Sequence, residues 1–201
     1  MQEIEAKFFV HDLTQIQRRL HQMEARLIHD RALETNLRFD LPGGGLSSKG
    51  LVLRLRRDSV SRLTYKSAGY EQQGILSRTE IELVVDDFEN AKHLLESLGY
   101  QIMFVYEKYR TTYALDDVQI MLDELPYGEF IEIEGGELET IQAAAAGLNL
   151  NWEAAIAASY HSLFNRLCTA KPQLDPGQLT FQALHGLRVL PEDLSITPAD
   201  R

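Results

Sequence analysis

The stretch Glu3-Ile4-Glu5-Ala6-Lys7 places two carboxylates and one ammonium group at alternate positions near the start of the chain. As a β-strand, it would carry Glu3, Glu5 and Lys7 on one face and apolar side chains on the other. Carboxylates about 7 Å apart on one face repel each other, so such a face is either solvated or holds cations. For this segment alone, a half-buried strand with a solvated face is the simpler interpretation. The same pattern returns later in the chain, and this repetition favours a site.

Later stretches also alternate charged with apolar residues, as half-buried strands do. The charged positions in these stretches are Glu34, Arg38, Arg54, Arg56, Lys66, Arg78, Glu80, Glu82, Lys108, Arg110, Asp123, Glu132 and Glu134. The apolar faces require a cover, and amphipathic helices are predicted at Leu13–Ile28, Phe88–Leu98, Leu138–Ala146 and Trp152–Cys168. An open sheet would leave the charged faces in water. A closed sheet would gather them inside a polar tunnel and would also remove the sheet edges.

Arginine, lysine and carboxylates gathered in one tunnel indicate a particular kind of ligand. Guanidinium groups bind phosphate oxygens in pairs, so converging arginines suit a polyphosphate. Carboxylates in the same cavity suit hard divalent cations, Mg²⁺ or Mn²⁺, that bridge protein and phosphate. The combination predicts metal-assisted chemistry on a triphosphate-containing small molecule.

The composition limits the other functions. The chain has 201 residues, a formal net charge of -10 and a pI near 5.1, which argue against a general nucleic-acid or anionic-membrane binder. Cys168 is the only cysteine, so no intramolecular disulfide forms. No apolar run is long enough to span a bilayer, and Met1 leads directly into the first predicted strand. We therefore expect a cytoplasmic protein with no membrane or nucleic-acid partner, and a homodimer is left open.

Two segments between or after the predicted strands carry no recognisable chemistry. Pro42–Gly45 is glycine-rich but lacks the Gly-Lys-Ser/Thr ending of a phosphate-binding loop, so we interpret it as a mobile hairpin loop. From residue 171 the composition changes to a proline-containing tail. We expect a domain over residues 1–170 and a tail over 171–201 that is loosely ordered or holds one short helix around Leu179–Leu190.

The ordered set of motifs resembles the CYTH superfamily, the triphosphate tunnel metalloenzymes. These motifs are Glu3-x-Glu5-x-Lys7, Arg54-x-Arg56, Lys66, Arg78-x-Glu80-x-Glu82, Lys108-x-Arg110, Asp123 and Gly128-x-Phe130-x-Glu132-x-Glu134. The resemblance covers residues 1–168, including Ser159-Tyr160 in the last predicted helix. It implies an α+β fold: a closed antiparallel barrel of about eight strands with amphipathic helices packed outside.

The resemblance also implies roles for individual residues. Metal ligands would be Glu3, Glu5, Asp123, Glu132 and Glu134. Phosphate-binding residues would be Lys7, Arg54, Arg56, Lys66, Arg78, Lys108 and Arg110, of which Lys7 and Arg56 would act in catalysis together with Glu134. Glu80, Glu82 and Arg38 would lie in the lumen without an assigned role. For every one of these residues, the alternative is an internal ion pair that satisfies a polar interior.

Three functions fit these charges: a triphosphatase, a class IV adenylate cyclase and a non-catalytic polyphosphate binder. Cyclases of the family tend to carry a His-Phe element before the first motif, whereas only Met1-Gln2 precedes it here. A simple binder gains little from a carboxylate cluster, so we favour hydrolysis of inorganic triphosphate, thiamine triphosphate or a nucleoside triphosphate. An aromatic platform for thiamine has the candidates Tyr70, Tyr106, Tyr127 and Trp152. The six histidines are interpreted as surface or packing residues.

Overall fold

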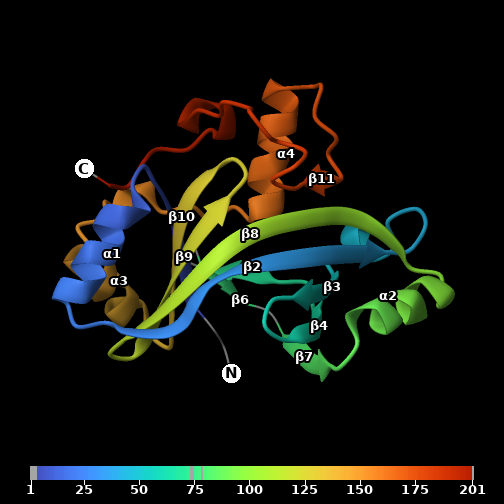
Figure 1. The fold of residues 1–201 in the computed structure, drawn as a ribbon, viewed down its shortest axis with the longest axis horizontal. Coiled ribbons are helices and arrows are strands. Elements are labelled where there is room, and N and C mark those ends of the chain that lie inside the picture. The colour runs from blue at the N-terminus through green and yellow to red at the C-terminus, as the bar shows by residue number, and fades with distance from the viewer. Residues whose placement is uncertain (1–3, 73–74, 78, 201) are drawn as a thin grey trace.

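The computed structural model describes residues 4–72, 75–77 and 79–200, and its centre is one curved, mainly antiparallel sheet (Figure 1). The long strands β2 and β8, each of 15 residues, pair antiparallel in the middle of this sheet. In order across the sheet, the strands are β1 (Ile4–Val10), β10 (Gly128–Gly135), β9 (Val118–Leu125), β8 (Gln101–Leu115), β2 (Arg26–Asp40), β3 (Val52–Arg57), β4 (Ser61–Lys66) and β7 (Glu80–Val85). The α+β class and the antiparallel strand set predicted from the sequence are confirmed.

The predicted closure of the sheet is not found. Within the described residues, no hydrogen-bonded ladder joins β7 to β1. The chain between β4 and β7 instead forms a separate hairpin of β5 (Tyr70–Gln72) and β6 (Ile75–Ser77), and β6 lies beside β1. The backbone groups of this hairpin pair with each other, so the sheet curls round a cavity without closing on itself through hydrogen bonds.

Helix α1 (Leu13–Gln22) is shorter than predicted. Its N-terminus is capped by Asp12, whose carboxylate accepts hydrogen bonds from the backbone N–H of Thr14 and Gln15. The helix ends six residues before the predicted Ile28, because the chain turns at Glu24, which has a φ of 59°, and enters β2 at Arg26. Pairing with β8 therefore overrides the apolar periodicity that continues through this segment.

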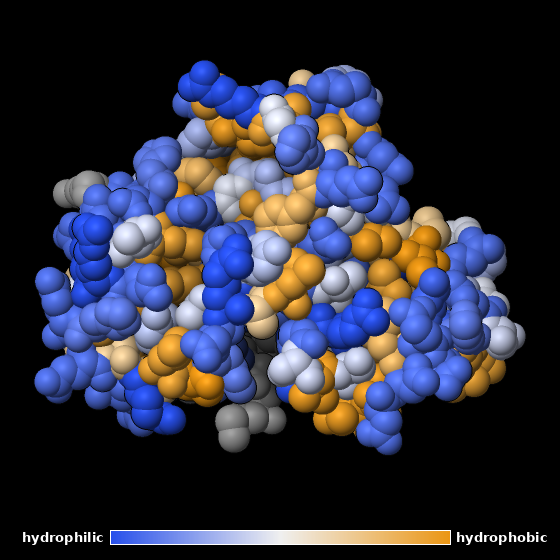
Figure 2. Space-filling view, viewed as in Figure 1, coloured by the Kyte–Doolittle hydropathy of each residue, from blue (hydrophilic) through white to orange (hydrophobic). Residues whose placement is uncertain are grey.

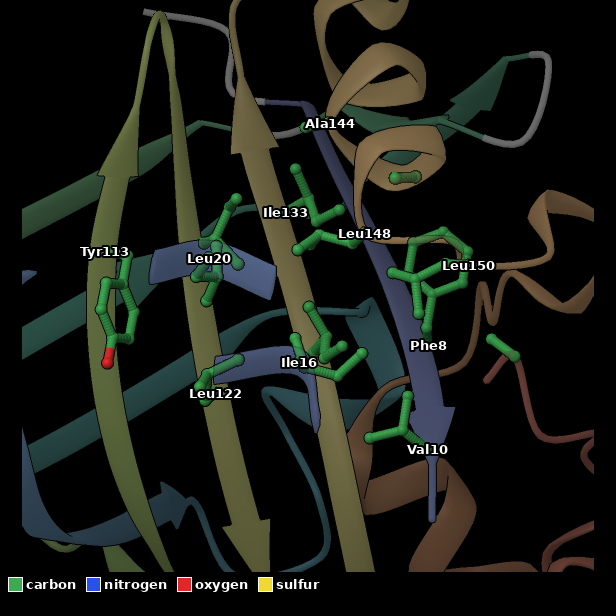
Figure 3. Close-up of a cluster of buried hydrophobic side chains, with 14 of the residues drawn as sticks. Phe8, Val10, Ile16, Leu20, Tyr113, Leu122, Ile133, Ala144, Leu148 and Leu150 are labelled. Atoms are coloured by element: carbon green, nitrogen blue, oxygen red, sulfur yellow. The ribbon is translucent and has the colours of Figure 1, made fainter. Parts of the chain in front are cut away.

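Helices cover the outer face of the sheet in two places. α1 and α3 (Leu138–Gly147) pack on β1, β9 and β10, and Figure 3 shows Phe8, Ile16, Ile133 and Leu148 meeting in the buried cluster between these elements. α2 (Phe88–Ser97) packs on β3 through Phe88, Leu95 and Leu55. Within the described residues, no helix is both long and apolar enough to cross a membrane.

The outer face of β7 is left without such a cover. Ile81 is 53% exposed and Leu83 is 58% exposed. Hydrophilic residues occupy much of the surface in Figure 2, with apolar residues interspersed among them. The sheet is thus thicker and better packed at its β1 edge than at its β7 edge.

Helix α4 (Tyr160–Ala170) closes one end of the cavity. On β1, β10 and β8, the face that carries Lys7, Glu132 and Lys108 becomes aromatic towards this end, with Phe9, Phe130 and Phe104. These rings pack against Phe164, Leu163 and Leu167 of α4, all of which are fully buried. The charged lumen therefore has an apolar floor.

Residues 171–200 pack along the outside of α4 and the neighbouring strands. β11 (Gln178–Leu179) pairs parallel with β8, and Leu179 and Leu194 are fully buried. Near the end of the chain, the backbone N–H of Ala199 donates to the Phe9 carbonyl at 2.8 Å. The segment forms turns and the 3₁₀ helix Pro191–Leu194 where the sequence suggests a loose tail or a helix at Leu179–Leu190. The domain boundary at residue 170 stays a prediction.

The glycine-rich loop after β2 is held by one carboxylate. Asp40 accepts hydrogen bonds from the backbone N–H groups of Leu41, Leu46 and Ser47 at 2.7–3.0 Å. These hydrogen bonds outweigh the effect of burial and lower the pKa of Asp40 to about 2. The loop is therefore organised by Asp40, although the sequence suggests only a mobile hairpin connection.

Candidate active site

The curved sheet encloses a cavity of about 1120 Å³ that is lined by side chains from all eight strands of the main path. The predicted site residues Glu5, Lys7, Arg38, Arg54, Arg56, Lys66, Glu80, Glu82, Lys108, Arg110, Glu132 and Glu134 line it. Asp123 is fully buried directly beneath this lining. Glu3 and Arg78 lie outside the described residues. The alternating charged residues of the sequence, as far as the structure describes them, thus line the same cavity.

Asp123 is the hub of the deepest ion-pair network. Its carboxylate accepts hydrogen bonds from Lys108 Nζ at 3.0 Å, from Arg110 Nε at 2.6 Å and from the Tyr160 hydroxyl at 2.8 Å. Burial lowers the pKa of Arg110, but the carboxylates of Asp123 and Glu132 outweigh it and hold that pKa well above its usual range. Asp123 therefore fixes two cations that face the cavity, and the predicted role of Asp123 as a metal ligand stays a prediction.

Glu132 holds Lys7 in the same network. Lys7 Nζ lies 3.2 Å from Glu132 Oε1, and Arg110 pairs with the other oxygen of the same carboxylate. Burial raises the pKa of Glu132, but Lys7, Arg110 and Lys108 outweigh burial and bring it well below its usual range. The Lys7 ammonium also lies 4.5 Å from the centre of the Tyr160 ring. Lys7 is thereby placed against the floor of the cavity.

Glu34 joins the two sides of the cavity. It is 2% exposed, accepts a hydrogen bond from Asn36 at 2.9 Å, and lies 3.7 Å from Lys108 and 3.8 Å from Arg56. Burial raises its pKa, but the surrounding cations, led by Lys108 and Arg110, lower it to about 2. Glu34 is therefore an internal counter-charge, as the ion-pair interpretation of this position holds.

Ion pairs that are more exposed hold the opposite side, formed by β3, β4 and β7. Arg56 lies 3.6 Å from Glu82 and Arg62 lies 3.3 Å from the same carboxylate, while Lys66 pairs with Glu80 at 2.6 Å. Arg54 donates to the Tyr106 hydroxyl at 3.3 Å. The Nε atoms of Arg54 and Arg56 are buried and make no hydrogen bond within the described part of the chain. These guanidinium groups retain capacity for acceptor oxygens.

The fixed charges of the cavity nearly cancel. Within the described residues, eight cationic side chains line it (Lys7, Arg38, Arg54, Arg56, Arg62, Lys66, Lys108 and Arg110), as do eight acidic ones (Glu5, Asp30, Glu34, Asp58, Glu80, Glu82, Glu132 and Glu134). A polyphosphate entering this space would add several negative charges. Cations that enter with the phosphate, or carboxylates that bind such cations, would restore the balance.

The carboxylates fit a divalent cation that is shared with a ligand. Glu5 lies opposite Glu134 in the pairing of β1 with β10, and both line the cavity. Carboxylates at directly opposed positions have Cβ atoms about 5 Å apart and so reach a common ion. No group of three or more acidic, histidine or cysteine side chains among the described residues forms a complete metal site. The donor set still suits Mg²⁺, which is typically bound by one or two carboxylates plus substrate phosphates.

The structure adds residues that the sequence did not mark as functional. Tyr160 and His161 begin α4 and line the cavity, and Arg62 and Asn36 complete the ion-pair network. The His161 ring lies 4.4 Å from the Phe104 ring, in agreement with its interpretation as a packing residue, and the structure adds that it lines the cavity. Burial and the nearby Arg38 charge lower the pKa of His161 to about 4. For these residues, the only indication in the sequence was the predicted resemblance of Ser159-Tyr160 to the last helix of the family.

The aromatic candidates fall in different places. Tyr106 lines the cavity. Tyr127 is 3% exposed and donates from its hydroxyl to the Tyr160 carbonyl at 3.0 Å, so it supports α4 from beneath. Trp152 packs on Phe8 at 5.7 Å on the outer face of the sheet. The Tyr70 side chain lies outside the part of the chain that is described.

Comparison with known proteins gives the family. The model of the CYTH domain matches residues 1–153, which is most of the chain. The protein therefore belongs to the CYTH family. No curated protein matches the chain.

Solved structures share the fold. The PH1012 protein from Pyrococcus horikoshii OT3 is 26% identical, with a TM-score of 0.66 over 79% of this chain and 96% of that one. A protein from Vibrio parahaemolyticus, described as an adenylate cyclase candidate, is 20% identical, with a TM-score of 0.70 over 80% of this chain and 95% of that one. HpAC1 from Hippeastrum is 20% identical, with a TM-score of 0.62 over 81% and 95%.

Proposed function

We propose that this protein hydrolyses a triphosphate substrate inside the cavity with the help of Mg²⁺ or Mn²⁺. The observation that carries the proposal is the convergence of Lys7, Arg54, Arg56, Lys108 and Arg110 from three strands round one space, with Glu5 opposite Glu134 beside them. Membership of the CYTH family supports an enzyme of this kind. HpAC1, first assigned as an adenylyl cyclase, is described as having a dominant triphosphatase activity.

The cationic residues of the cavity would bind different parts of the triphosphate according to their positions. Arg54 and Arg56 would bind phosphate oxygens through their guanidinium groups, because their Nε atoms make no hydrogen bond within the described chain. Lys7 and Arg110 would stabilise negative charge on the transferring phosphoryl group, since Glu132 already holds both in place. Lys108 and Lys66 would add charge on either side.

The cation would be held by Glu5 and Glu134, with Glu3 as a further predicted ligand. When bound, the ion supplies neutralising charge to phosphate oxygens and activates water as a nucleophile. The chain's own contribution is to orient the phosphates and to exclude bulk water, for which the apolar floor formed by α4 is suited. A cytoplasmic setting remains a further prediction, and a homodimer is left open.

The second candidate is a class IV adenylate cyclase, and one observation favours it. Phe104 and Tyr106 line the cavity next to Arg54, where a base could rest. Hydrolysis of inorganic triphosphate would not need these two rings, whereas a cyclase needs a place for the base of ATP.

Product analysis separates the candidates. Incubating the protein with ATP or inorganic triphosphate and Mg²⁺ or Mn²⁺ should release orthophosphate, and chelation of the metal should stop the reaction. Cyclic AMP formed in equal amounts with pyrophosphate, and without orthophosphate, would favour the cyclase. Tight triphosphate binding without any product would leave a polyphosphate binder. Turnover that persists in excess chelator would contradict the metal requirement.

A further inference from the structure

Strand β7 is the last strand of the sheet and is paired on one side only. Its partner is β4, and the register between the two strands is unbroken. β7 lies at the lower rim of the molecule in the view of Figure 1, and Figure 2 shows apolar side chains at this rim. Five of its six residues are exposed, including Ile81 at 53%, Leu83 at 58% and Val84 at 66%. An exposed apolar edge of this kind is a template for a further strand.

Alternate residues of β7 direct their backbone groups away from β4. In an antiparallel ladder, every second residue directs both its N–H and its C=O at the partner strand. The N–H of Ser67 donates to the carbonyl of Thr79 at 2.9 Å, where the ladder between β4 and β7 begins. The odd-numbered residues therefore face β4, and Glu80, Glu82 and Val84 direct their N–H and C=O groups at the other edge. Within the described part of the chain, these groups have no backbone partner.

A second copy of β7 fits this edge. Antiparallel pairing about a two-fold axis perpendicular to the sheet keeps the outer face of one copy beside the outer face of the other. With Leu83 on the axis, the opposed residues of the two copies are Leu83 with Leu83, Ile81 with Val85, and Glu82 with Val84. All pairs on the outer face are then apolar, and the outward backbone groups of Glu82 meet those of Val84. The same surface is thus complementary to itself.

Charge favours this register over its neighbours. A slip that puts Glu82 on the axis places the two copies of this carboxylate directly opposite each other. The opposite slip puts Val84 on the axis and places Glu82 of each copy opposite Asp86 of the other. With Leu83 on the axis, carboxylates meet only at the ends of the paired segment, where Glu80 faces Asp86.

We propose that the free edge of β7 is a dimer interface, at which two copies of the protein join their sheets antiparallel with Leu83 on the two-fold axis. The proposal does not depend on the reaction in the cavity, because Ile81 and Leu83 lie on the outer face of the sheet. A strand of six residues is about 20 Å long. The interface therefore belongs to the small class, below about 1,200 Å² in total, and the dimer is weak.

Sedimentation velocity of the full-length protein tests the association. The dimer should appear as the concentration rises towards about 1 mM, the range of weak complexes. Leu83→Lys places two ammonium groups opposite each other and should raise the dissociation constant about tenfold or more. Leu83→Glu should act likewise, and an equimolar mixture of the two variants should associate again because the opposed charges then attract. Melting temperatures confirm that each variant is folded.

Leu98→Lys is the matched control. Leu98 is 64% exposed at the end of α2 that lies away from β7, so the same added charge should leave the dissociation constant unchanged (Figure 1). A wild type that stays monomeric throughout, or a dimer that Leu83→Lys leaves intact, would overturn the proposal. So would a mixture of Leu83→Lys and Leu83→Glu that associates no better than either variant by itself.

Cysteine cross-linking tests the register. The two copies of residue 83 would form a pair without mutual hydrogen bonds, with Cα atoms about 4.5 Å apart, which a disulfide can span. The two copies of residue 81 would lie about 13 Å apart along the strands, which a disulfide cannot span. In a Cys168→Ser background, which removes the only native cysteine, Leu83→Cys should form a disulfide-linked dimer on mild oxidation and Ile81→Cys should not. Equal cross-linking of both variants would overturn the proposed pairing.

Discussion

The charged side chains on the two sides of the cavity are buried to different degrees. On the packed wall, formed by β1, β10, β9 and β8, the side chains of Lys7, Lys108 and Asp123 are at most 6% exposed. On the open wall, formed by β3, β4 and β7, the side chains of Arg62 and Glu82 are 25% and 35% exposed. The packed wall is covered outside by α1 and α3, whereas Ile81 and Leu83 of β7 are exposed.

This difference separates two uses of the same residue types. A buried ion pair leaves an uncompensated charge when one partner is removed, so the packed wall depends on each of its members for stability. Pairs that are partly exposed contribute little to stability and rearrange at low cost. We infer that the packed wall presents a preformed set of cations, while the open wall exchanges its internal carboxylates for ligand oxygens.

The largest effect that tests this comparison is expected from Asp123→Asn. The change leaves Lys108 and Arg110 without their shared carboxylate in a buried position. Unfolding free energy should fall by about 3–5 kcal/mol. Glu82→Gln on the open wall is the matched control and should cost about 1 kcal/mol or less. Denaturant titration measures both, and equal losses would remove the distinction between the walls.

Acid should weaken the contact between the walls, because Glu34 pairs with a cation from each. Its pKa is lowered from an ordinary 4.5 to about 2, so its contribution to stability is complete above pH 4.5 and is lost as the pH falls towards 2. The shift corresponds to about 3 kcal/mol. Unfolding free energy measured between pH 5 and pH 2 should show this loss. In Glu34→Gln the slope should be shallower, and an unchanged slope would refute the assignment.

Binding should depend on the open wall more than stability does. Arg56→Ala removes a guanidinium group whose nearest carboxylates lie 3.6–3.8 Å away, so little structural support is lost. The affinity for inorganic triphosphate should fall by about 1.5–3 kcal/mol, the value of a hydrogen-bonded charged contact. Calorimetric titration gives the affinity and thermal melting gives the stability. A large fall in melting temperature with an unchanged affinity for inorganic triphosphate would reverse the proposed roles of the two walls.

The sequence predicted which residues of the packed wall face the cavity, but it did not predict which of them contact each other. Alternation in Glu5-x-Lys7 and Glu132-x-Glu134 is a local property of strands, so the cavity-facing set of described residues followed from it. The register that joins Asp123 to Arg110 and Lys108 depends on which strands pair, which no local pattern encodes.

Helix ends and short elements were predicted less well. The apolar stripe of α1 continues into β2, and only pairing with β8 ends the helix at Gln22. The β5–β6 hairpin is built from three-residue strands that fall below the length at which alternation is recognisable. Tyr160 and His161 reach the cavity because α4 packs on Phe104 and Phe130, and this tertiary contact has no periodic signal.

The smallest expected effect concerns Tyr160, which links the packed wall to the floor of the cavity. Tyr160→Phe removes the hydroxyl that donates to Asp123 at 2.8 Å and keeps the ring beside Lys7. The unfolding free energy should fall by about 1 kcal/mol, because Asp123 retains its bonds to two cations. Tyr127→Phe, which removes the hydroxyl bonded to the Tyr160 carbonyl, is the matched control and should cost a similar amount without touching Asp123. If Tyr160 positions Asp123, only Tyr160→Phe should also weaken triphosphate binding, since Asp123 fixes Arg110 and Lys108. Equal affinities in the two variants would limit Tyr160 to a packing role.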